Sequence, residues 1–281
     1  MASIHAIPDQ YVASTRGKTT LIIKKGFEDI LKDVEWETPE ELLLKYASAD
    51  IAHGRGTVAV IPCARRKVFM KKMLHGGFFG PILGDAFSAD RVVDNLRYSS
   101  ILKAKGIPSP EAVFVILKKK GSHFFEGYIG EELIEEAENL IQIFRRKISE
   151  EVRRELLRRT ASLLNHFHNE GFYHRDLNAG NVIIKMAPDK LHELLFFIDL
   201  DRMRKNERIG NLKRLENIFR LFRSFRKSVG SERFSEKDED AFLEYYCSSD
   251  PRRLSAFRIL IPFYRFSFLF HRLAWTVFGR R

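Results

Sequence analysis

Asp176 and Asn181 are the residues of this sequence whose types and spacing best suit joint chemistry. They lie in the run HRDLNAGN at residues 174–181, which matches the pattern H-R-D-L-x-x-x-N of phosphoryl-transfer loops in every fixed position. An aspartate there orients an acceptor hydroxyl and takes its proton, while the asparagine turns back toward a metal ion. Both groups reach one point only if the chain between them is an irregular loop.

A second acid follows in the place that this chemistry requires. Asp199 ends the apolar run at residues 194–198, where a carboxylate can hold magnesium against nucleotide phosphates. The triplet there reads Asp-Leu-Asp, so Asp201 stands where protein kinases have glycine, and no Ala-Pro-Glu segment follows. An isolated His-Arg-Asp is commonly a surface ion pair, but the full run followed by a strand-terminal acid favours catalysis.

The residues that would hold the nucleotide are less specific. Gly54, Arg55, Gly56 and Thr57 precede a predicted strand, and backbone N–H groups in such a turn can approach phosphates. The third glycine of G-x-G-x-x-G is missing, since Ala59 stands there. The segment is equally compatible with a plain turn.

Lys71 ends the next predicted strand and fits the lysine that pairs with the α- and β-phosphates. Lys72 is the alternative, on the opposite face of the strand. The usual partner is a glutamate in the following helix, but residues 88–105 contain none. Either Asp94 pairs with Lys71, or the pair is absent.

Hydrophobic periodicity predicts a small β-rich lobe followed by a larger helical lobe. The division is expected at residues 1–129 and 130–281, with a link near Gly127 to Gly130. Thr38 is expected to cap a short helix that opens at Pro39. The predicted strands are 19–23, 57–61, 67–71, a hairpin of 113–117 with 123–129, 182–184 and 194–198, and the predicted helices are 88–105, 131–144 and 150–170.

Composition narrows the class of partner. The 281 residues carry a formal net charge of +11 with 44% hydrophobic residues, which indicates a folded, basic protein suited to an anionic partner. The two cysteines have no metal-ligand spacing and suit a reducing cytosol. We expect no signal peptide and no membrane span.

Two basic stretches remain. Residues 202–227 alternate cationic and apolar side chains, typical of a core helix with a cationic face that is solvated or binds acidic sugars. Residues 252–281 interleave aromatics with Arg258, Arg265 and Arg272, seven positions apart. This tail is either an interfacial helix on anionic lipid or a terminal helix packed on the large lobe.

The sequence resembles the lipopolysaccharide core kinases, the Kdo/heptose kinase family of Gram-negative bacteria, and is closer to the Kdo kinase branch. Two departures stand out: the arginine-rich stretch of the family reads KKMLH at residues 71–75, and its helix glutamate aligns best with Asn95. The motifs that carry the resemblance are GRGT at 54–57, GG at 76–77, GIPSP at 106–110, IDLDR at 198–202, NLKRL at 211–215 and RSFRK at 223–227.

The resemblance implies an α+β, protein-kinase-like two-lobed fold, ATP with Mg²⁺, and an inner-core sugar hydroxyl as acceptor, with Kdo favoured. Asp176 would be the catalytic base, Asn181 and Asp199 the metal ligands, and residues 54–57 with Lys71 the nucleotide-binding groups. The protein would be cytoplasmic and peripheral on the inner membrane, contacting anionic lipid and no nucleic acid. The alternatives are a protein or small-molecule kinase of the same fold, or a pseudokinase-like module that binds anionic lipid.

Overall fold

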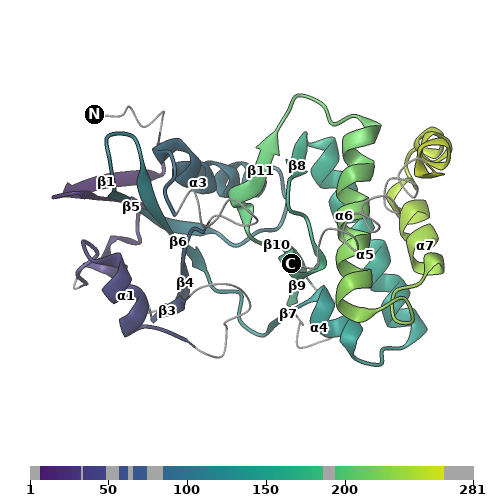
Figure 1. The fold of residues 1–281 in the computed structure, drawn as a ribbon, viewed down its shortest axis with the longest axis horizontal. Coiled ribbons are helices and arrows are strands. Elements are labelled where there is room, and N and C mark those ends of the chain that lie inside the picture. Colours follow the sequence, from purple (N-terminus) through teal and green to yellow (C-terminus); the bar gives the residue numbers. More distant parts are fainter. Residues whose placement is uncertain are drawn as a thin grey trace, which may run out of the picture. The chain divides into compact units, whose positions relative to one another are not determined.

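The chain divides into two compact units, Met1–Glu135 and Glu136–Arg281. The first is built on a β-sheet and the second on helices (Figure 1). The structure is a computed structural model that describes residues 7–32, 34–48, 57–62, 66–74, 85–185 and 194–262.

The first unit holds a six-stranded antiparallel sheet. Its strand order is β1-β2-β5-β6-β4-β3, so the two central strands are β5 and β6. The alternating and continuous apolar runs of the sequence form these strands as expected, and β1 is an addition that the sequence did not indicate. The bounds are β1 (Tyr11–Arg16), β2 (Thr19–Lys24), β3 (Val58–Pro62), β4 (Lys67–Lys72), β5 (Ala112–Lys119) and β6 (Phe125–Glu132).

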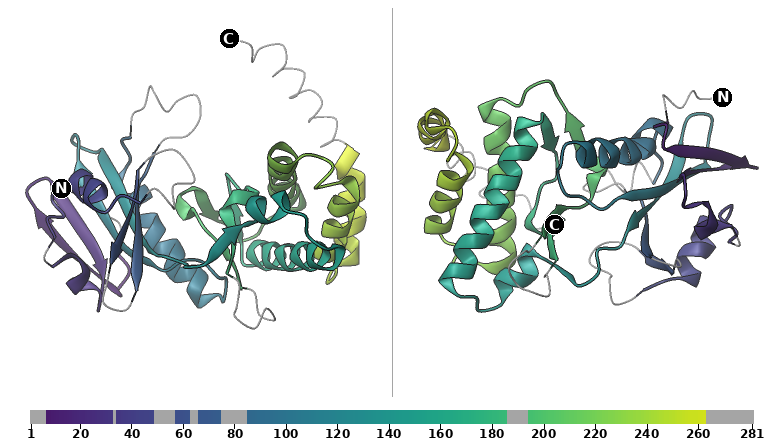
Figure 2. Two further views of the ribbon diagram at one scale, coloured as in Figure 1. Left: turned by 90° about the horizontal axis from the view of Figure 1, so that it is seen from below. Right: turned by 180° about the vertical axis from the view of Figure 1, so that it is seen from behind.

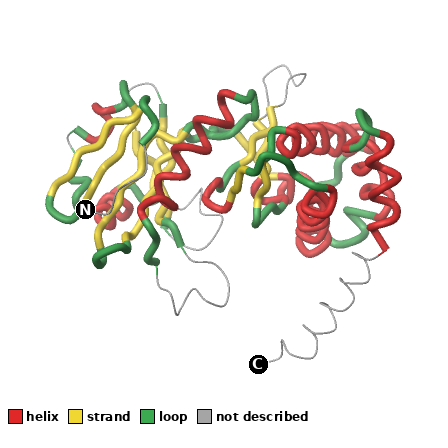
Figure 3. Tube along the Cα trace, turned by 90° about the horizontal axis from the view of Figure 1, so that it is seen from above, coloured by secondary structure: helices red, strands yellow, loops and turns green. Residues whose placement is uncertain are grey.

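Helices cover both faces of this sheet. The short helix η1 (Glu28–Leu31) and α1 (Pro39–Lys45) pack with Met70 and Tyr128 on one face. On the other face α3 (Ala89–Ala104) packs its apolar side on Ile129 and Met73. Figure 3 shows α3 running across the strands. Both long predicted features, the hairpin and the helix at 88–105, are confirmed.

The faces of β4 separate its two lysines. Lys71 lies opposite Ile129 and Lys72 opposite Tyr128 on β6, and directly opposite residues share a face. Ile129 belongs to the core under α3 and Tyr128 to the core under α1. Lys71 therefore points to the α3 face and Lys72 to the α1 face.

The expected link at Gly127 to Gly130 is instead part of β6. Gly130 lies opposite Phe114 of β5, and a Cβ at Gly130 would stand 2.3 Å from Cε1 of that ring. A Cβ at Gly127 would stand 2.7 Å from the Val92 side chain of α3. Because these glycines have no side chain, Phe114 and Val92 can pack closely against β6. The first unit ends at Glu135.

The second unit is mainly helical. Figure 2 shows α5, α6 and α7 side by side, and short strands lie in the chain between α5 and α6. Its strands are β7 (Ala137–Asn139), β8 (Phe172–His174), β9 (Val182–Lys185), β10 (Leu194–Phe197) and β11 (Met203–Lys205), and its helices are α4 (Leu140–Arg145), α5 (Glu150–Asn169), η2 (Ala179–Asn181), η3 (Leu200–Arg202), α6 (Asn211–Val229), α7 (Glu236–Tyr246) and residues 251–262.

Three local expectations are wrong. The helix predicted at 131–144 is only α4, because Glu131 pairs within β6 and a capping box of Asn139 with Gln142 starts the helix later. The basic stretch at 202–227 becomes helical only at α6, since β11 precedes it. Thr38 does not cap α1 with its side chain, which donates to Glu41 instead.

No helix within the described ranges is long and apolar enough to cross a membrane. The proposed interfacial tail lies largely outside those ranges, at residues 263–281.

Close packing at Gly130 gives a stability prediction. We expect Gly130→Ala to lower the free energy of unfolding by about 1–3 kcal/mol, because the new methyl group collides with the buried Phe114 ring. Gly121→Ala is the control, since no heavy atom lies within 4 Å of a Cβ there. Chemical denaturation followed by circular dichroism measures both, and equal midpoints for the two variants would contradict this packing.

Candidate active site

The loop that carries Asp176 joins β8 to β9 and is stabilised by hydrogen bonds from its own side chains. The carbonyl of Asp176 accepts hydrogen bonds from the side-chain nitrogens of Asn178 at 3.1 Å and Asn181 at 3.2 Å. Asn178 Oδ1 in turn accepts from the backbone N–H of Gly180 at 2.9 Å. The Asp176 side chain is exposed, so this irregular loop presents its carboxylate to solvent.

His174 joins the two acids of the site through a buried imidazole. Its Nε2 lies 2.9 Å from the backbone oxygen of Asp199, and its Nδ1 accepts from the backbone N–H of Asp176 at 3.1 Å. A carbonyl can only accept and a backbone N–H can only donate, so Nε2 carries the hydrogen and the ring is neutral. Burial also lowers the pKa of His174, against the raising effect of Asp199.

Asp199 follows β10 in a left-handed conformation, with φ 64° and ψ 58°. Aspartate tolerates this region better than most residues, and such positions concentrate where a side chain must be aimed. The preceding residue, Ile198, donates its backbone N–H to the carbonyl of Asn181 at 3.0 Å. Asn181 and Asp199 are thereby held together at the ends of neighbouring strands.

The oxygens of Asn181 and Asp199 fit a magnesium ion. Asn181 donates through Nδ2, which turns its amide oxygen to the other side, and amide and carboxylate oxygens are hard ligands. Within the described ranges, no group of three or more His, Cys, Asp or Glu gathers to hold a metal. Two protein ligands suffice for Mg²⁺, which commonly keeps water and substrate phosphates as its other ligands.

A buried polar network behind the loop was missed from the sequence. Asn217 of α6 clamps the backbone of His174: its Oδ1 accepts from the N–H at 3.2 Å, and its Nδ2 donates to the carbonyl at 2.8 Å. His168 of α5 lies 3.1 Å from the same Oδ1 and 2.7 Å from the hydroxyl of Tyr246 on α7. Arg214 donates to that hydroxyl at 2.9 Å. Three helices therefore hold one strand of the site.

Burial keeps His168 neutral. Asn217 Oδ1 only accepts, so His168 Nε2 donates, and the neutral ring then accepts from Tyr246 at Nδ1. Burial lowers the pKa of His168 to about 3, with the Arg214 charge adding to the effect and the Asn217 hydrogen bond opposing it. Protonation would bury a charge.

The residues predicted to bind the nucleotide belong to the first unit. Of residues 54–57, Gly54, Arg55 and Gly56 lie outside the described residues, and Thr57 is exposed next to β3. Lys71 Nζ is 4.0 Å from Oε2 of Glu131 on the neighbouring strand, which is a partner that the sequence did not suggest.

The helix α3 does not supply the expected acid. Asp94 pairs with Arg97 at 2.8 Å rather than with Lys71. Asn95 is buried and donates to the carbonyls of Arg91 and Val92 within α3. The Lys71–Asp94 pair offered by the sequence is therefore wrong.

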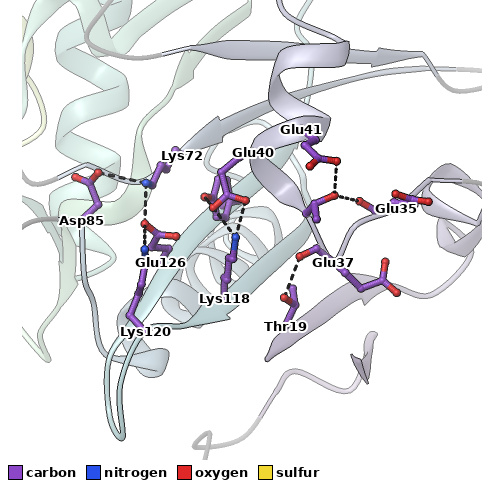
Figure 4. Close-up of polar contacts among 12 residues, drawn as sticks. Thr19, Glu35, Glu37, Glu40, Glu41, Lys72, Asp85, Lys118, Lys120 and Glu126 are labelled. Carbon is purple, nitrogen blue, oxygen red and sulfur yellow. Dashed lines mark hydrogen bonds and ion pairs between the residues drawn. The ribbon is translucent and has the colours of Figure 1, made fainter. Parts of the chain in front are cut away.

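Lys72 is committed to a different network on the α1 face. Its Nζ contacts Glu126 at 3.0 Å and Asp85 at 3.3 Å, and Lys120 shares Glu126 at 3.2 Å (Figure 4). Burial opposes the charge of Lys72, but these hydrogen-bonded carboxylates leave its pKa raised.

The same face anchors α1. Glu40 accepts from Lys118 at 2.8 Å through both carboxylate oxygens (Figure 4). It also accepts from the hydroxyl of Tyr128 at 2.9 Å. The lysines on this face are held by carboxylates, and Lys71 remains the lysine predicted to bind phosphates.

A β-rich unit and a helical unit, with Asp176 and Asn181 in one loop and Asp199 after β10, have the architecture of a protein-kinase-like fold. The same architecture occurs in a solved structure described as WaaP in complex with acyl carrier protein. That structure is 16% identical with a TM-score of 0.55, over 84% of this chain and 95% of the other.

Relatives identify the family more closely. Residues 50–246 match the model of the lipopolysaccharide kinase (Kdo/WaaP) family. A 3-deoxy-D-manno-octulosonic acid kinase of Mannheimia succiniciproducens is 26% identical over 205 residues, which is 69% of this chain and 82% of the relative. One of Actinobacillus succinogenes is 26% identical over 184 residues, 63% of this chain and 74% of the relative. This chain belongs to the lipopolysaccharide kinase (Kdo/WaaP) family and is a kinase.

The neutral His168 predicts a loss of stability in acid. The unfolded chain binds a proton on this residue below its ordinary pKa of 6.5, while the folded chain binds it only near 3. Stability from this group is thus full above pH 6.5 and falls by about 1.4 kcal/mol per pH unit below it. Denaturant titrations at several pH values give the free energy of unfolding as a function of pH. His168→Gln should show a shallower dependence of this free energy on pH than wild type. Equal slopes for wild type and His168→Gln would contradict the assignment.

The two lysines of β4 make a matched pair for a second prediction. We expect Lys71→Met to reduce kcat/KM for ATP about 100-fold, because a phosphate-binding charge is lost. Lys72→Met should lower the thermal midpoint, since it leaves the buried Glu126 with one cation fewer, and change the KM for ATP little. A larger loss of ATP affinity in Lys72→Met than in Lys71→Met would reverse the assignment.

Proposed function

We propose that the protein transfers the γ-phosphate of ATP to a hydroxyl of 3-deoxy-D-manno-octulosonic acid (Kdo) in the lipopolysaccharide inner core. The observation that supports this proposal most strongly is the complete loop at residues 174–181, which His174 connects to Asp199 by hydrogen bonds. The names of the similar relatives, which are 3-deoxy-D-manno-octulosonic acid kinases, support the choice of sugar.

Each candidate residue has a role in this proposal. Asp176 orients the sugar hydroxyl and takes its proton as the oxygen attacks the γ-phosphorus. Asn181 and Asp199 hold magnesium, which when bound offsets negative charge on the phosphates. Lys71 holds the donor phosphates, and residues 54–57 cover them with backbone N–H groups.

The acceptor sets the proposed location. A glycolipid precursor lies in the membrane, so the enzyme acts as a peripheral protein on the cytoplasmic face of the inner membrane. The formal net charge of +11 supports contact with anionic lipid. We expect no nucleic-acid partner.

Two rival functions remain testable in the same assay. A protein or small-molecule kinase would phosphorylate a peptide or free metabolite in preference to Kdo-bearing lipid A. A pseudokinase-like lipid-binding module would bind anionic vesicles with no ATP turnover. The hydrogen-bonded geometry of Asp176, Asn181 and Asp199 favours an active enzyme over the module.

Phosphate transfer from labelled ATP to Kdo-bearing lipid A tests the function. Wild type should label this acceptor but not lipid A without Kdo, and Asp176→Asn should lower kcat by at least about 100-fold, because the proton acceptor is removed. Asp240→Asn is the control, since it makes the same change on an exposed position of α7. Full activity in Asp176→Asn, or no transfer by wild type, would refute the proposal.

A further inference from the structure

One face of α6 lies against the catalytic loop. Ser224 Oγ accepts a hydrogen bond from the backbone N–H of Ala179 at 3.0 Å, and the side chain of Glu216 interacts with that of Tyr173, just before the loop. Arg220 is four residues from each, so all three helix residues share this face. Because its neighbours contact the chain on both sides of Asp176, Arg220 is directed to the part of the loop that holds Asp176.

Arg220 is held in place by a carboxylate. Its Nη2 and Nε lie 2.9 and 3.3 Å from the same oxygen of Glu216. Hydrogen bonds from Arg220 and Tyr173 outweigh the effect of burial and lower the pKa of Glu216, so this carboxylate stays ionised. A guanidinium has five N–H donors in a planar fork. Glu216 takes donors on the Nε side of the fork and Tyr173 also interacts with the guanidinium, so of the five N–H donors some remain for a planar anion.

Arg220 acts on Asp176 through space rather than by contact. The two charges interact electrostatically, yet within the described residues no ion pair of 4.0 Å or less joins them. The Arg220 side chain keeps 32% of its surface exposed and Asp176 is exposed. Acceptor atoms can therefore reach both groups, one cationic and one able to take a proton.

We propose that Arg220, oriented by Glu216 and Tyr173, binds the carboxylate of the sugar acid whose hydroxyl Asp176 deprotonates. Arginine recognises carboxylates through paired N–H donors, which fixes the orientation of the sugar as well as its affinity. A neutral sugar would lack this contact, so Arg220 is a specificity-determining residue for an acidic acceptor. This inference rests on the proposed function, because it assigns part of the same acceptor site.

Kinetics with paired acceptors separate this role from a structural one. The acceptors are Kdo-bearing lipid A and the same molecule with the Kdo carboxylate converted to its methyl ester. The variants are Arg220→Gln and Arg220→Lys, with Arg252→Gln as an exposed arginine control in the same unit. Thermal midpoints establish that each variant is folded.

We expect Arg220→Gln to raise the KM for the acid acceptor about 10- to 100-fold, as for a lost hydrogen bond to a charged group, with the KM for ATP unchanged. Arg220→Lys should recover part of the loss, and Arg252→Gln should match wild type. Wild type should prefer the acid to the ester by a similar factor, and Arg220→Gln should treat them alike.

Two results would overturn the inference while leaving the proposed function intact. One is a persistent preference for the acid over the ester in Arg220→Gln, which would assign the carboxylate to another residue. The other is a lower kcat with an unchanged acceptor KM, which would make Arg220 a positioning group for Asp176. No transfer by wild type to either acceptor would refute the proposed function, and this inference with it.

Discussion

The candidate active site depends on one buried imidazole. His174 donates to the carbonyl of Asp199 and accepts from the N–H of Asp176, so a single neutral ring fixes the backbone of the proposed proton acceptor relative to that of a proposed metal ligand. Neither bond survives in the other tautomer, because a carbonyl and a backbone N–H have fixed roles. The positive φ of Asp199 is held by this contact and by the neighbouring strand pairing.

Helices of the second unit hold His174 in place through buried hydrogen bonds. Asn217 clamps the strand that carries His174, and the bonds continue through His168 and Tyr246 to Arg214, so α5, α6 and α7 meet in one satisfied polar network. Buried polar groups of this kind are costly unless every member is paired. The same helix α6 then presents Arg220 on its loop-facing side, which links the scaffold to the choice of acceptor.

The sequence predicted the parts of the site that are local. Asp176 and Asn181 lie in one loop, and Asp199 follows an apolar strand, so spacing and periodicity were enough. The hydrogen bonds between Asn217 and His174 could not be predicted from the sequence. Asn217 lies 43 residues from His174, and its contact depends on how α6 packs. A signal was present: Arg214 and Asn217 stand among the apolar positions of an amphipathic helix. The partner of Lys71 was missed for a related reason, because the acidic run around Glu131 resembles a helix but pairs as a strand.

Nitrogen-detected NMR of the protein labelled with ¹⁵N-histidine tests the central constraint most directly. The signals of His174 are assigned by their loss in His174→Asn. Our account predicts a neutral ring protonated at Nε2 from neutral pH down to the ordinary histidine pKa, because burial lowers the pKa of His174. A ring protonated at Nδ1, or an imidazolium within that range, would contradict it.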